Sequence, residues 1–223
     1  MPRAARIVLP GFAHHVTQRG NNRQDVFFAP ENRRRYLALL KRQCDKYGLQ
    51  VEGYCLMTNH VHLVVRPATE ASLAKALGRT HFLYTRYVNR LHGRSGHLWQ
   101  NRFYSCPVDD DHVLAVMRYV ERNPVRSGSV ARPWDFPWSS ASAHIGKPDL
   151  TGLSDAANWA QRIAPEVWAQ LLMGPDSEGE LSNVRKSTRS GRPLVGDQTL
   201  SRLEIMLGRR LRARPRGRPP REK

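Results

Sequence analysis

Residues 49–67, LQVEGYCLMTNHVHLVVRP, decide the fold because they contain two strand-like runs around a tight-turn signal at Thr58-Asn59. The pattern predicts a β-hairpin whose second strand opens with His60 and His62. Side chains two residues apart on a strand share a face, so both imidazoles lie on one side and Val61 lies on the other. Paired imidazoles are good ligands for a divalent metal. The open alternative is a pair of polar residues on a covered strand face.

The segments around this hairpin alternate between strand and helix patterns. A glycine stop signal at Gly48 ends the first helix, and Ser72 is a good N-cap for the second. The predicted elements are a mostly extended strand interrupted near Pro10-Gly11, two helices and a short strand, at residues 7–17, 31–48, 72–93 and 102–108. With the hairpin, this order predicts an α+β, ferredoxin-like fold, in which a β-α-β-β-α-β chain forms an antiparallel sheet with helices on one face.

A third amphipathic helix is predicted from about His112 to Arg122, with acidic residues in its first turn and a proline stop. Its apolar residues form one stripe, and Tyr119 lies roughly 120° from the centre of that stripe by helical geometry. His112 and Asn123 share the side of Tyr119, so a hydroxyl and an amide could face a common partner. A tyrosine at the core margin, with its hydroxyl in solvent, is the open alternative.

The chain is strongly basic. It has 36 Lys and Arg against 19 Asp and Glu, a formal charge of +17, and a pI of about 10.8. This charge predicts a polyanionic partner, with nucleic acid ahead of an acidic membrane. No apolar run is long enough to span a membrane, and the N-terminus lacks the apolar region of a signal peptide. Three scattered cysteines suggest neither a disulfide framework nor a thiolate zinc site. A cytoplasmic, nucleoid-associated protein is expected.

The composition changes after about residue 130, where RPWDFPWSSASAH is rich in Trp, Pro and Ser. Residues 146–184 are expected to form a helical extension that wraps the core, with a helical stretch around 156–173, and residues 185–223 a basic, flexible DNA-binding tail. That tail has 13 Lys and Arg against 3 Asp and Glu, and one short helix is predicted at 200–211. Its Pro-Arg-Gly-Arg-Pro core, at residues 215–219, looks like an AT-hook, in which Arg216 and Arg218, with Arg214 beside them, would follow the minor groove. A cationic tail without sequence preference is the alternative.

Four motifs together resemble a known family. They are MTNHVHLVV, GHLWQNRFYSCPVD, MRYVERNPVRSGSV and DFPWSSASAH, and the opening PGFAHHVTQRGNNRQDVFF also fits. The resemblance is to the REP-associated tyrosine transposases, within the single-tyrosine HUH (IS200-like) transposases, and it covers residues 1–145. It implies a nuclease domain that cuts and rejoins single-stranded DNA at hairpins.

Carried over residue by residue, the resemblance makes Tyr119 the nucleophile, which would form a 5′-phosphotyrosine intermediate. It makes His60, His62 and Asn123 the ligands of a divalent metal, Mg or Mn. Asn123 precedes Pro124, which disfavours helical geometry at that residue.

Arg102 is expected to contact DNA, and His112 is a possible assistant in deprotonating Tyr119. Stacking of exposed bases on Tyr104 or Trp99 is plausible, although both could equally be core residues. The partner is single-stranded or hairpin DNA. Monomer and homodimer remain open.

Three other readings are weighed. A DNA-binding regulator that keeps the fold without cutting is the main rival, and the intact His60, His62 and Tyr119 argue against it. A replication initiator or relaxase would share the chemistry, but the chain has no G-x-x-x-x-G-K phosphate loop. A structural zinc protein is disfavoured because no thiolates cluster near the histidines.

Overall fold

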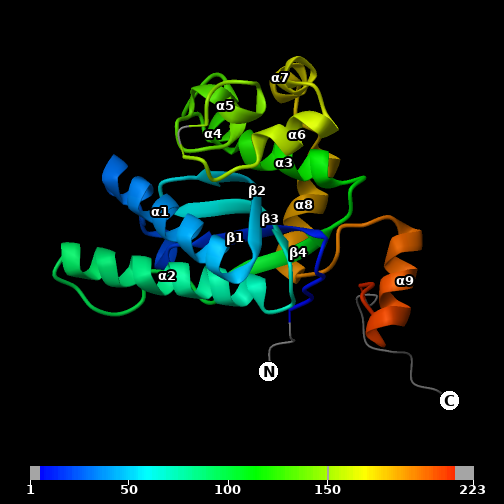
Figure 1. Ribbon diagram of the computed structural model, residues 1–223, viewed down its shortest axis with the longest axis horizontal. Coiled ribbons are helices and arrows are strands. Elements are labelled where there is room, and N and C mark those ends of the chain that lie inside the picture. The colour runs from blue at the N-terminus through cyan, green and yellow to red at the C-terminus, as the bar shows by residue number, and fades with distance from the viewer. Residues whose placement is uncertain (1–5, 150, 214–223) are drawn as a thin grey trace.

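The computed structural model describes residues 6–149 and 151–213. Within these residues, four strands form one antiparallel sheet in the order β2-β3-β1-β4 (Figure 1). The strands are β1 (Ala13–Arg19), β2 (Leu49–Leu56), β3 (His60–Pro67) and β4 (Tyr104–Val108). This order, with the β-α-β-β-α-β connection, confirms the predicted ferredoxin-like fold.

The helices fall into three groups along the chain. The two helices of the ferredoxin-like unit are α1 (Pro30–Tyr47) and α2 (Ser72–Leu91). The short central helices are α3 (Val113–Glu121), α4 (Asn123–Arg126) and α5 (Ala141–His144). The C-terminal helices are α6 (Ala156–Arg162), α7 (Pro165–Met173), α8 (Glu178–Ser190) and α9 (Asp197–Leu207). None of the described helices is long and apolar enough to cross a membrane.

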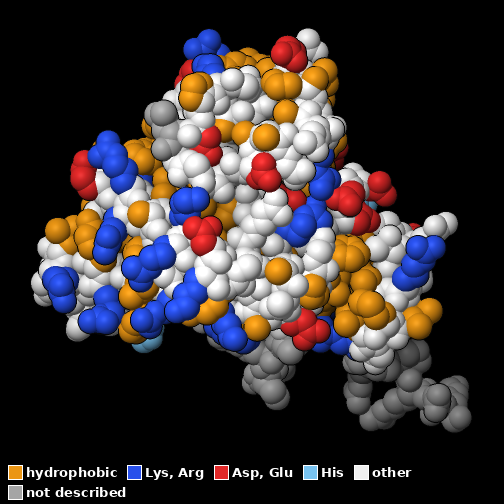
Figure 2. Space-filling view, viewed as in Figure 1, with side chains coloured by type: hydrophobic (Ala, Val, Ile, Leu, Met, Phe, Trp, Pro, Cys, Tyr) orange, Lys and Arg blue, Asp and Glu red, His pale blue; other side chains and the backbone are white. Residues whose placement is uncertain are grey.

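The first face of the sheet packs against α1 and α2. Val61, Leu63 and Val65 of β3 point to this face and are fully buried in a core with both helices. α1 ends where Gly48 adopts the left-handed conformation (φ +61°), which glycine enters without steric cost. On the outer side of α1 and α2, basic side chains gather in the space-filling view (Figure 2).

The second face of the sheet is covered by α3 and by helices of residues 146–149 and 151–213, the C-terminal extension. Val64 and Cys106 of the sheet contribute to a second core with Val116 of α3 and Trp168 of α7. The carboxylate of Glu121 is fully buried there and accepts a hydrogen bond from the Trp168 indole at 2.9 Å. The extension therefore builds a core of its own on the sheet, where the sequence predicts only a wrapping segment.

Gly53 lets α3 approach the sheet closely. It lies at an irregularity in the β2–β3 pairing, and a Cβ atom built there would lie 2.3 Å from the Met117 sulfur. A larger residue at position 53 would displace the Met117 side chain and the Ser140 hydroxyl, so glycine allows this close approach of α3.

Two predicted boundaries at the N-terminal half are wrong. β1 begins at Ala13 and not at Ile7, because the interruption predicted near Pro10-Gly11 is present as a turn: Phe12 donates to the Leu9 carbonyl at 3.2 Å, and Gly11 has φ +80°. Ser72 is not the N-cap of α2, since Ala71 holds that position. The Ser72 hydroxyl instead accepts from the Thr69 amide at 3.1 Å.

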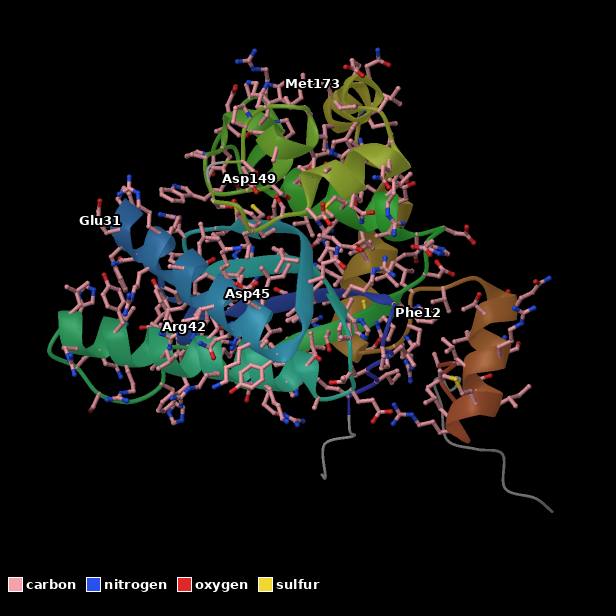
Figure 3. The ribbon with its side chains drawn as sticks, viewed as in Figure 1. Phe12, Glu31, Arg42, Asp45, Asp149 and Met173 are labelled. Atoms are coloured by element: carbon pink, nitrogen blue, oxygen red, sulfur yellow. The ribbon has the colours of Figure 1, made fainter. Side chains whose placement is uncertain are left out.

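The C-terminal half differs from expectation in its helix boundaries. The helical stretch expected at 156–173 is two helices, because the chain becomes extended at Ile163 and Ala164 before Pro165. The helix expected at 200–211 spans Asp197–Leu207, and the expected division at residues 184 and 185 lies inside α8. α9 packs on the N-terminal segment, where Phe12, labelled in Figure 3, joins a small apolar cluster with Leu203.

Candidate functional site

His60 and His62 lie at the start of β3, on the face that α3 covers. The β1 residues opposite them are Arg19 and Thr17. The ring centroids of His60 and His62 are 5.0 Å apart, and the two ring planes are nearly perpendicular, at 81°. His62 is buried and His60 is partly exposed. Both imidazoles thus share one face, as the strand alternation predicts.

A third histidine, His15 of β1, stacks on His62. The two rings are nearly parallel, at 7°, with centroids 5.2 Å apart, and His15 Nε2 lies 3.0 Å from His62 Nδ1. No motif in the sequence marks His15. Alternation in β1 does place one of His14 and His15 on this face, but only the strand register shows which of them meets His62.

A chain of hydrogen bonds fixes the proton positions on these two rings. The Thr188 hydroxyl of α8 donates its single proton to the Val184 carbonyl at 2.8 Å, so it accepts from His15 Nδ1 at 2.6 Å. His15 Nε2 is then an acceptor, and His62 Nδ1 donates to it. The lone pair on His62 Nε2 is left for another ligand, a common arrangement for metal-binding histidines.

Burial keeps all three rings neutral. It lowers the pKa of His15 to about 3 and takes the pKa of His62 well below its usual value, with His60 and His15 contributing. Burial, followed by the charge of Arg19, lowers the pKa of His60 to about 4, while a hydrogen bond with Asn123 opposes the decrease. Neutral imidazole is the form that binds metals.

Tyr119 projects from α3 onto the histidine pair. Its ring is half-buried and meets both His15 and His62 edge-on, at centroid distances of 5.6 Å and angles of 77° and 80°. Its hydroxyl has no hydrogen-bond partner within residues 6–149 and 151–213. The tyrosine that helix periodicity placed off the apolar stripe therefore faces the imidazoles.

Arg126 of α4 lies over the ring of Tyr119. Its guanidinium carbon lies 4.6 Å from the centroid of the tyrosine ring, and its guanidinium also donates to the Tyr119 carbonyl. Burial lowers the pKa of Arg126, and Asp176 opposes the decrease from 3.7 Å away. Nη1 of Arg126 is buried without a hydrogen-bond partner among the described residues. No spacing pattern in the sequence marks this arginine.

Asn123 reaches the histidine pair despite the proline that follows it. It opens the short helix α4, and its side chain lies close enough to the His60 ring to raise the pKa of that imidazole. The Asn59 side chain engages His60 Nδ1, at 2.7 Å. Asn123 therefore lies in one site with the His60–His62 pair.

The remaining candidates lie elsewhere. His112 donates from Nδ1 to Asp109 at 2.5 Å, and no contact joins it to Tyr119 within the described residues. Trp99 is buried in the first core, whereas Tyr104 is 45% exposed. Arg102 is exposed beside β4. The tail candidates lie outside the described residues: Arg214, Arg216 and Arg218.

Comparison with known proteins finds related chains. The family model described as "Transposase IS200 like" matches residues 10–123. A Haemophilus influenzae protein whose name assigns it to the REP-associated tyrosine transposases is 29% identical over 131 residues, covering 49% of this chain and 74% of that protein. The solved structure of a REP-associated tyrosine transposase bound to a REP hairpin matches with a TM-score of 0.57 at 16% identity, covering 70% of this chain and 90% of that one. This last likeness shows a shared fold.

Proposed function

This chain belongs to the IS200-like transposase family, as its motifs predict, and on that premise we propose that it cleaves and rejoins single-stranded DNA at hairpins. The supporting observation is that Tyr119 and the His60–His62 pair converge within one chain, with the tyrosine ring 5.6 Å from that of His62. Hairpin DNA is proposed because the solved relative is bound to a REP hairpin.

A divalent metal, Mg or Mn, fits the side chains at this site. The chemistry of the donors supports the assignment: His60 and His62 each have Nδ1 engaged and Nε2 available, and an amide oxygen from Asn123 is a ligand that such ions accept. No three His, Cys, Asp or Glu side chains are grouped to hold a metal in the described parts of the chain, so the amide would be needed. When bound, the metal would polarise the scissile phosphate.

Tyr119 would act as the nucleophile. Its phenolic oxygen attacks the scissile phosphorus, a tyrosyl O–P bond forms, and the bond to the 3′ oxygen breaks with its electron pair. The products are a 5′-phosphotyrosine and a free 3′-OH, with the phenol proton passing to solvent. Because the new bond is also a phosphodiester, a 3′-OH can attack it in reverse and join strands without another energy source.

Arg126 would stabilise the negative charge that develops on Tyr119. Its guanidinium lies over the tyrosine ring in a poorly solvated position, where a cation interacts strongly with nearby charge. This role replaces the one predicted for His112, whose ring is engaged by Asp109.

Thr188 and His15 would act as positioning residues for His62. Together they hold its proton on Nδ1 and leave Nε2 free to bind. Thr188 lies in the C-terminal extension, beyond the segment that the family model matches. The extension would therefore contribute to the site from outside the ferredoxin-like unit.

The test is covalent capture. The full chain is incubated with Mn²⁺ and a labelled DNA hairpin carrying a single-stranded flank, and protein-linked label is resolved on a denaturing gel. We expect an adduct with the native chain and with Tyr47→Phe, a control on α1, but none with Tyr119→Phe or in the presence of a chelator.

The rival function predicts a different result in the same assay. A DNA-binding regulator would bind the hairpin tightly and form no adduct with any variant. An adduct that persists in Tyr119→Phe would show instead that another residue is the nucleophile.

A further inference from the structure

An arginine-rich cleft lies at the outer edge of β4, between the sheet and the C-terminal extension. It has a volume of about 570 Å³. Its walls come from residues 101–105 before and within β4, residues 188–192 at the end of α8, and residues 209–211 after α9, with two residues of the N-terminal segment. The arginines that line it are Arg6, Arg102, Arg189, Arg192, Arg209 and Arg210.

The positive charge of this cleft is not compensated. No Asp or Glu of the described residues lines it. Arg6 donates to the Phe103 carbonyl at 3.0 and 3.3 Å and stacks on the Phe103 ring. In the described ranges, the other five arginine side chains have no ion pair and no side-chain hydrogen bond. Like charges repel, so a concave surface that collects them is suited to a polyanion.

The cleft continues the catalytic face of the sheet. Tyr104 is opposite Thr17 in β1, and Thr17 is opposite His62 in β3, so the three side chains share one face. With strands about 4.8 Å apart, the mouth of the cleft lies roughly 10 Å from the backbone of His62. The exposed Tyr104 ring, at this junction, offers a platform on which a base can stack.

The arginines of the cleft suit the phosphates of a nucleic-acid strand. Arginine binds phosphate with parallel hydrogen bonds from its planar fork.

We propose that this cleft binds the single-stranded DNA adjoining the scissile phosphate, with its arginines on the phosphates and Tyr104 stacked on a base. The inference rests on the proposed function and adds a second DNA contact made by the C-terminal extension. Its arginines at 189–210 lie beyond the segment that the family model matches.

The test compares two DNA molecules. The same labelled hairpin is prepared with a long single-stranded flank and without one, and the binding of each to the full chain is measured by fluorescence anisotropy at several salt concentrations. The cleft variant is Arg189→Ala with Arg192→Ala. The matched control is Arg79→Ala with Arg86→Ala, two exposed arginines of α2 on the opposite side of the sheet.

We expect the cleft variant to bind the flanked hairpin about tenfold more weakly and the unflanked hairpin unchanged. Its salt slope on the flanked DNA should fall by about 1.4, or about 0.7 for each lost phosphate contact with a single strand. Tyr104→Ala should also weaken flank binding, while Tyr104→Phe should not. Relative to the native chain, the affinity of the control variant for the two DNAs should change by the same factor.

The proposal would be overturned if the cleft variant bound each DNA as tightly as the native chain does. It would also be overturned if the cleft variant lost the same affinity for both DNAs. Adduct formation distinguishes a failure of the cleft proposal from a failure of the proposed function. A cleft variant that forms the adduct on a hairpin with a minimal flank leaves the chemistry intact. If the native chain shows flank-dependent binding but forms no adduct, the cleft proposal stands and the proposed chemistry is rejected.

Discussion

A tyrosine meets a buried histidine on each face of the sheet, Tyr36 with His81 under α1 and α2, and Tyr119 with His62 under α3. On the first face, the Tyr36 hydroxyl is hydrogen-bonded to His81 Nε2 at 3.1 Å, and Tyr36 is fully buried. On the second face, the rings meet edge-on and the tyrosine is only partly buried. The same two residue types therefore occur in two different chemical states.

The difference lies in which polar atoms are already engaged. The bond between Tyr36 and His81 satisfies both groups within a cluster of aromatic rings that includes Trp99. In the described part of the chain, neither the Tyr119 hydroxyl nor His62 Nε2 has a partner. Buried polar groups are normally satisfied, so unsatisfied atoms at a partly open position indicate a place for a ligand. The first pair stabilises the fold, and we propose that the second is positioned for chemistry.

The largest expected effect comes from removing the two tyrosine hydroxyls separately. Tyr119→Phe should reduce DNA cleavage about 10³-fold or more with little change in stability, because a nucleophile acts only in the reaction. Tyr36→Phe should leave cleavage per folded molecule intact and cost about 1 to 3 kcal/mol of unfolding free energy, because His81 loses its partner. Cleavage rates and urea unfolding measure both. A similar loss of cleavage in both variants would erase the distinction between the faces.

Shortening a core side chain under the site should affect stability first. Leu63 is fully buried on the first face, next to His62 in sequence. Leu63→Ala should cost about 2 to 5 kcal/mol of unfolding free energy through lost burial and the remaining cavity. Cleavage per folded molecule should change only a few-fold. If cleavage disappears in a variant that unfolding curves show to be fully folded, the two faces are more tightly coupled than proposed.

The pH dependence of the unfolding free energy should report the protonation of His81, the histidine of the first face. Burial lowers the pKa of His81 to about 3, against 6.5 without that burial. Between these values the unfolded chain binds a proton that the folded chain excludes, so stability falls as the pH falls through this window. His81→Gln lacks this titration. Its loss of unfolding free energy between pH 7 and pH 5 should be about 2 kcal/mol smaller than that of the native chain, at about 1.4 kcal/mol per pH unit below 6.5.

Urea unfolding at the two pH values measures this difference directly. Other buried histidines titrate in both proteins and cancel in the comparison. Equal losses in the native chain and His81→Gln would mean that His81 is protonated in the folded state.

A smaller effect is expected at Thr188. Thr188→Val keeps the shape of the side chain but removes the acceptor for His15 Nδ1, so the proton position on His62 is no longer fixed. We expect Mn²⁺ to bind about tenfold more weakly, by calorimetry, and the NMR signals of the His62 ring nitrogens to show a mixture of tautomers. Thr188→Ser should restore both. Unchanged metal affinity and an unchanged His62 spectrum in the valine variant would reject the positioning role.

The sequence predicts the fold and part of the site because both follow from local periodicity. Alternation in β3 places His60 and His62 together, and the helical period places Tyr119 off the apolar stripe of α3. The chain order of strands and helices then brings the two segments onto one sheet. These inferences need only the spacing of residues along single elements.

His15, Arg126 and Thr188 could not be identified in this way because their roles depend on contacts between distant segments. The hydrogen bond between His15 and Thr188 joins residues 173 positions apart, and it exists only because α8 packs on β1 and β4. The arginine cleft likewise combines segments from both ends of the chain. No local pattern marks these residues as neighbours.

The most direct test of the difference between the two faces is to locate the covalent bond. The native chain is incubated with a flanked hairpin and Mn²⁺, the adduct is digested with nuclease and protease, and the modified peptide is sequenced by mass spectrometry. We predict a nucleotide linked through its 5′ phosphate to Tyr119. A modification on any other tyrosine, or hairpin cleavage without a linked peptide, would contradict the assignment of this face as the catalytic one.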